Sequence, residues 1–61
     1  MSATLSLAAI RVLATDSRPL MLRGIAAAID SVHPFLEMVD TATDYGSAVG
    51  KAERLRPDEV L

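Results

Sequence analysis

The chain has 61 residues, of which 51% are hydrophobic and 23% are charged, and its formal net charge at pH 7 is −2. This composition excludes a disordered tail, and the scattered arginines form no basic stripe that would bind a nucleic-acid backbone directly. A chain of this length makes at most one domain, and its stability is marginal. There is no cysteine and only one histidine, His33, so neither disulfides nor a Cys/His zinc site can support it.

Residues 1–9 read as a mildly apolar N-terminal lead. The lead lacks a basic start, and Arg11 interrupts the apolar run well before the length that spans a bilayer. No targeting or lipidation signal is visible. We therefore expect no contact with a membrane and a cytoplasmic location.

Residues 10–15 read I-R-V-L-A-T and are closed by a polar D-S-R-P cluster, which predicts a buried strand. A helix should follow, with Ser17 as its N-cap and Pro19 in its first turn, where the missing N–H has no cost. Gly24 costs about 1 kcal/mol in a helix interior and therefore suggests close packing on a neighbour. The apolar positions fall on one helical stripe: Leu22, Ile25, Ala26, Ile29 and Val32.

Pro34 ends this helix, since the residue before a proline is pushed out of the helical region. Residues 35–42, F-L-E-M-V-D-T-A, predict a second strand in which Leu36, Met38 and Asp40 share one face. Thr43 and Asp44 are candidate N-caps for a second helix. The apolar positions of that helix are Ala48, Val49, Ala52 and Leu55.

Arg56-Pro57 stops the second helix, and the chain then turns apolar again. The order is β-α-β-α-(β), an α/β fold whose strands should be parallel and joined by right-handed crossovers. Two helices and an incomplete third strand cannot cover both faces of such a sheet. We therefore expect exposed apolar surface and a piece of a larger α/β domain.

Four features occur in order along residues 10–61: D-S-R-P at 16–19, then Gly24, then A-T-D-Y-G-S-A at 42–48, and finally the closing L-R-P-D-E-V-L. Together they resemble the first half of a receiver domain of bacterial two-component response regulators of the NarL/LuxR type. The family commonly has a second acid where this chain has Ser17, and its glycine at the second helix lies one place earlier. The resemblance implies a partial flavodoxin-like fold, truncated in the third strand, with residues 10–61 as an incomplete receiver domain.

In that family an acidic pair holds Mg²⁺ together with a phosphoacceptor aspartate. The resemblance makes Asp16 the remnant of the metal-binding pair, with Ser17 at the second position, and places the acceptor just beyond Leu61. It implies no catalytic residue and no cofactor for this chain, which would not be an enzyme. Independently of the resemblance, Asp16 would also complement the dipole of the following helix.

Three hypotheses for function follow. The first is the N-terminal part of a response regulator, whose family acts in phosphorelay signal transduction and transcription regulation, with a sensor histidine kinase or another receiver as partner. The second is a non-catalytic interaction module or decoy that binds such a kinase or receiver. The third is a truncated gene product without function. Two further residues are weaker candidates: Tyr45 could contact a partner or cover the end of the sheet, and His33 has no carboxylate placed by the sequence to work with it as a general base.

Overall fold

The computed structural model describes residues 9–61, and residues 1–8, most of the predicted lead, lie outside the described part. The elements follow in the predicted order β-α-β-α-β. They are β1 (Ile10–Thr15), α1 (Pro19–Asp30), β2 (Leu36–Ala42), α2 (Tyr45–Leu55) and β3 (Glu59–Val60). The prediction of an α/β fold is confirmed, and β2 begins one residue later than expected.

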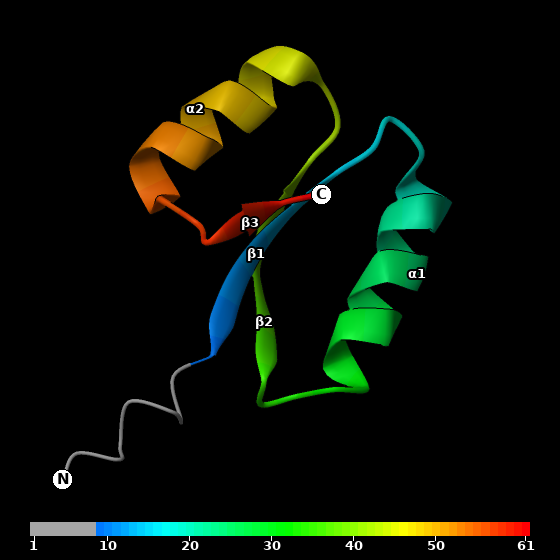
Figure 1. Cartoon of the computed structure of the whole chain (residues 1–61). Coiled ribbons are helices and arrows are strands. Elements are labelled where there is room, and N and C mark those ends of the chain that lie inside the picture. The colour runs from blue at the N-terminus through cyan, green and yellow to red at the C-terminus, as the bar shows by residue number, and fades with distance from the viewer. Residues whose placement is uncertain (1–8) are drawn as a thin grey trace, which may run out of the picture.

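The three strands are parallel and lie in the order β2-β1-β3, with β1 in the centre. This is the order in which the first three strands of a flavodoxin-like sheet are arranged. The chain crosses from β1 to β2 in one direction and from β2 to β3 in the other. Right-handed crossovers then place α1 and α2 on opposite sides of the sheet, as Figure 1 shows.

The core is centred on β1, whose apolar run is buried between the two layers of helix. The buried hydrophobic residues are Val12, Leu13, Ala14, Leu22, Ile29 and Ala42. No residue of α2 is buried. Large apolar side chains remain exposed, among them Leu20 at 77% and Phe35 at 72% of their area. The expected exposure of apolar surface is therefore confirmed.

A β-bulge interrupts the pairing of β1 with β2. Val12 lies opposite Met38, but Leu13 lies opposite Asp40, so Val39 is the extra residue on β2. A bulge of this kind shifts the alternation of side chains between the two faces of a strand. The predicted side-chain faces of β2 therefore cannot hold beyond this point.

The bulge separates Asp40 from the other side chains of its predicted face. Leu36 and Met38 line a hollow beside α1. Asp40 instead lies 3.4 Å from the Nζ atom of Lys51 on α2, which covers the opposite side of the sheet. The prediction that Leu36, Met38 and Asp40 share one face is wrong, because the extra residue reverses the strand's alternation between Met38 and Asp40.

The start of α1 also differs from the prediction. Its N-cap residue is Arg18, with Pro19 as the first helical residue, and no side chain caps the helix. Ser17 is therefore not the N-cap, because the Asp16 carboxylate binds the backbone N–H of Arg18 and sets the turn one residue later. The close packing inferred for Gly24 is wrong as well, since a Cβ atom placed there would meet nothing within 4 Å.

The ends of α2 are defined by local contacts. Asp44 is the N-cap residue, and its carboxylate accepts the backbone N–H of Ser47 at 2.8 Å. At the other end Arg56 is the C-cap residue and adopts a left-handed conformation with φ of 50°. A non-glycine residue in that conformation costs roughly 1–2 kcal/mol.

We expect Arg56→Gly to stabilise the chain by up to about 1 kcal/mol, because glycine adopts the left-handed conformation without steric cost. The gain is smaller than the full strain, since glycine also gains freedom in the unfolded chain. Urea unfolding followed by circular dichroism measures it. The matched control is Arg54→Gly inside α2, which should destabilise by about 1 kcal/mol. Equal losses in both variants would contradict the prediction.

Candidate functional site

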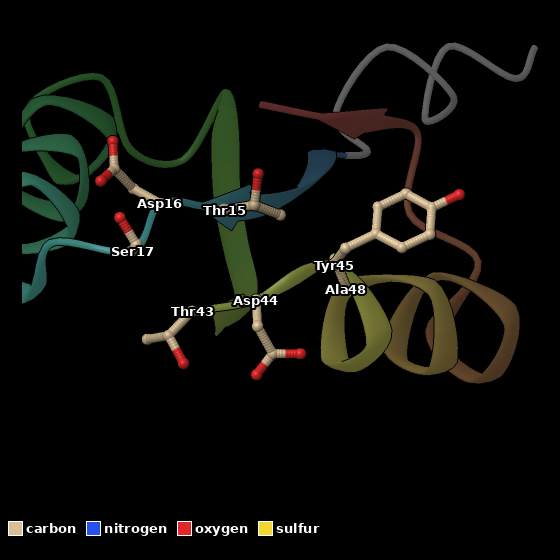
Figure 2. Close-up of a pocket in the computed structure, with 7 residues that line it drawn as sticks. All are labelled: Thr15, Asp16, Ser17, Thr43, Asp44, Tyr45 and Ala48. Atoms are coloured by element: carbon tan, nitrogen blue, oxygen red, sulfur yellow. The ribbon is translucent and has the colours of Figure 1, made fainter.

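The carboxyl ends of β1 and β2 meet at one edge of the sheet, where the chain turns into the two helices. A hollow of about 280 Å³ lies there (Figure 2). Its lining comes from both turns: Thr15, Asp16, Ser17, Thr43, Asp44, Tyr45 and Ala48. Open parallel sheets bind their ligands at this edge, next to the strand where the order reverses, which here is β1.

Asp16 is held by Arg18 through three hydrogen bonds. Its Oδ1 atom accepts the backbone N–H of Arg18 at 2.8 Å and the Nε–H at 3.0 Å. Its Oδ2 atom accepts from Nη2 of the same guanidinium at 3.0 Å. The Asp16 side chain is 19% exposed and that of Arg18 is 67% exposed, so the pair lies at the surface. The side-chain hydrogen bonds from Arg18, followed by its backbone N–H, lower the pKa of Asp16 from 3.8 to about 2.

We expect Arg18→Ala to raise the pKa of Asp16 back toward its ordinary value of 3.8. In the unaltered chain the lowered pKa stabilises the fold above pH 4, and that contribution is lost as the pH falls from about 4 toward about 2. A carboxyl-carbon NMR titration measures both values. Arg23→Ala removes the same charge elsewhere on α1 and should leave the pKa of Asp16 low. An unaltered chain in which Asp16 titrates near 3.8 would contradict the pairing.

The second carboxylate of the hollow, that of Asp44, caps the start of α2. The Oδ1 atom of Asp44 accepts the N–H of Ser47, and the carboxylates of Asp16 and Asp44 point in different directions in Figure 2. Ser17 contributes only a neutral hydroxyl. Within residues 9–61 no three acidic, histidine or cysteine side chains are grouped so that they could hold a metal ion.

Mg²⁺ requires near-octahedral oxygen coordination and usually takes one or two carboxylates from the protein. Here both carboxylate oxygens of Asp16 already accept hydrogen bonds from the Arg18 guanidinium. The side chains of this edge therefore do not fit a resident Mg²⁺, and we assign no step to one. The role of Asp16 as a remnant of a metal-binding pair stays a prediction.

Sequence reasoning missed the part that Arg18 plays, although the signal was present. An Asp-x-Arg spacing just before a proline allows one residue to bind the carboxylate with both its backbone and its side chain. Tyr45 also lines the hollow, but it is 84% exposed, so the prediction that it could cover the end of the sheet is wrong, and its contact with a partner stays a prediction.

The Arg-Pro-Asp segment proves to join β3 to β1. Asp58 accepts the backbone N–H of Arg11 at 2.8 Å and donates its own N–H to the Arg11 carbonyl at 2.8 Å. The guanidinium of Arg11 donates to the carbonyl oxygen of Arg56 at 3.1 Å. These contacts set where β3 begins. Asp58 therefore has a structural role that the sequence did not reveal.

His33 lies at the opposite edge, in a hollow of about 220 Å³ between the end of α1 and the start of β2. Two carboxylates, those of Asp30 and Glu37, line the same hollow. The short turn after α1 brings them together. Within residues 9–61, however, the His33 imidazole forms no hydrogen bond with either carboxylate, so there is no acid–base pair.

The fold and the edge thus define an open parallel α/β sheet with a small hollow at its carboxyl edge. No family model, curated protein or solved structure matches this chain. In the part of the chain that the structure describes, neither helix is long and apolar enough to cross a membrane.

Proposed function

We propose that this chain is the amino-terminal part of a receiver-like domain of the two-component response regulators. As part of such a regulator it acts in phosphorelay signal transduction and transcription regulation, in the cytoplasm. The observation that carries the proposal is the strand order β2-β1-β3 with Asp16 at the carboxyl end of the central strand. That is the position at which flavodoxin-like sheets bind their ligands. The ordered motifs along residues 10–61 support it independently.

We propose further that the chain is not an enzyme and does not itself accept a phosphoryl group. A phosphoacceptor needs a carboxylate oxygen free to attack and positive charge that stabilises the transferred group. Both oxygens of Asp16 accept from Arg18, and Asp44 caps α2. A carboxylate that already accepts three hydrogen bonds is a poor nucleophile.

Two measurements test the proposal. Incubated with acetyl phosphate, the chain should show no acyl phosphate by intact-mass spectrometry. The gene, read onward from Leu61, should encode an apolar run that ends at an aspartate within a few codons. An acyl phosphate on a residue within residues 1–61, or a gene without such an aspartate, would overturn the proposal.

The second candidate, a non-catalytic module that binds a kinase or another receiver, is favoured by one surface. At the start of α1, Leu20 is 77% exposed and Met21 is 42% exposed, next to the exposed Arg18. Exposed apolar side chains rimmed by charge are typical of protein interfaces. If this candidate is right, Leu20→Asp should abolish binding to a histidine kinase's dimerisation domain in a pull-down, whereas Val60→Asp on β3 should not.

A further inference from the structure

At the carboxyl end of β1 the carboxylate of Asp16 is paired with the guanidinium of Arg18. We propose that the guanidinium of Arg18 occupies the positions on Asp16 that a divalent cation would use, so that this edge excludes the metal and is independent of it. Arg18 is then a positioning residue that substitutes for a bound ion. The inference concerns the same edge as the proposed function, and it rests on that function only for the kind of ion considered.

The geometry of the pair supports this assignment. A guanidinium is planar and presents two N–H groups in the spacing of a carboxylate, which makes the bidentate pair stronger than a single charged contact. Here Nε and Nη2 each lie 3.0 Å from a different oxygen of Asp16. The backbone N–H of Arg18 adds a third bond at 2.8 Å. All three donors belong to a residue two positions away, so the pair forms without bringing distant parts of the chain together.

The competition with a metal ion depends on two positions. An exposed ion pair is by itself worth little, at most about 1 kcal/mol. A single carboxylate is also a weak ligand, because Mg²⁺ gives up its hydration water reluctantly and needs several oxygen ligands. Ser17 is uncharged, so removing Arg18 alone would still leave Asp16 without a second charged ligand beside it for the metal. A second acid at position 17 should therefore create a useful metal site only if Arg18 is removed as well.

The experiment compares four full-length chains: the unaltered chain, Ser17→Asp, Ser17→Asp with Arg18→Ala, and Ser17→Asp with Arg23→Ala. The probe is Mn²⁺, a hard and paramagnetic cation that suits carboxylate and water ligands. Its binding is read from the broadening of amide NMR signals at constant ionic strength. Arg23 is exposed on α1, away from the edge, so its removal matches the change in net charge.

In the unaltered chain we expect the amides of residues 15–18 to broaden no more than those beside Asp30, an exposed carboxylate without a cationic partner among residues 9–61. The variant with Ser17→Asp and Arg18→Ala should bind Mn²⁺ at residues 15–18 up to about 5-fold more tightly than Ser17→Asp alone, which is the factor that corresponds to about 1 kcal/mol for the exposed pair. The Arg23→Ala counterpart should bind like Ser17→Asp alone.

Three results would overturn the inference. They are saturable Mn²⁺ broadening centred on residues 15–18 of the unaltered chain, equal gains from Arg18→Ala and Arg23→Ala, and no localised binding when Arg18 is absent and position 17 is acidic. The first result requires no substitution, so the test stands even if a variant does not fold. A gene without an aspartate after Leu61 would overturn the proposed function but would leave these outcomes unchanged.

Discussion

Leu13→Ala should remove a large share of the chain's free energy of unfolding. Leu13 lies in the central strand and none of its surface is exposed. Replacing a buried leucine with alanine costs about 2–5 kcal/mol, because the cavity left behind is only partly filled. At roughly 0.05–0.15 kcal/mol per residue, a chain of this length has a total stability of about 3–9 kcal/mol. Urea unfolding followed by far-ultraviolet circular dichroism measures the loss.

The control for this prediction is the same substitution at an exposed leucine. Leu20 lies in the first turn of α1 with 77% of its surface exposed. Leu20→Ala removes little buried area and places a good helix former in a helix, so stability should change by less than about 0.5 kcal/mol. Similar losses at both positions would show that the sheet does not contain the core described above.

The second large effect is expected at Ile29, the residue through which the last turn of α1 packs on the sheet. Its side chain is 6% exposed and lines the hollow between α1 and β2. Ile29→Ala should cost about 2–5 kcal/mol. Because only Leu22 and Ile29 of α1 are buried, the loss should fall mainly on the attachment of α1. Native-state amide exchange should therefore accelerate more in α1 than in β1.

Val32→Ala is the matched control for Ile29→Ala. Val32 follows α1 with 41% of its side chain exposed, so shortening it should leave exchange in α1 almost unchanged. Equal acceleration of exchange in α1 and β1 upon Ile29→Ala would show instead that the chain opens as one unit.

The order of the elements could be predicted because it depends on signals between near neighbours. The apolar run of residues 10–15 forms β1, and the helical stripe that contains Leu22 and Ile29 forms the buried face of α1. Asp44 was a candidate cap and does cap α2. Periodicity and capping act within one or two turns of the chain, so the sequence carries them directly.

The arrangement of the candidate site was only partly predictable. The position of Asp16 at the end of a strand followed from the pattern, but the sequence did not indicate what its carboxylate would bind. A serine before the proline favoured capping by Ser17, whereas the folded turn gives both oxygens of Asp16 to Arg18. Which of two neighbouring side chains closes a turn depends on backbone angles that residue type alone does not determine.

The sequence by itself determined the alternation of strands and helices, the apolar character of the central strand and the approximate limits of each element. Only the tertiary structure decided that β1 lies between its two partners, that Val39 bulges out of register, and that Asp58 binds Arg11 across 47 positions of the chain. Local patterns record what each residue prefers among its neighbours. Register and long-range hydrogen bonds depend on how whole elements meet, because a single inserted residue reverses which side of a sheet every later side chain faces.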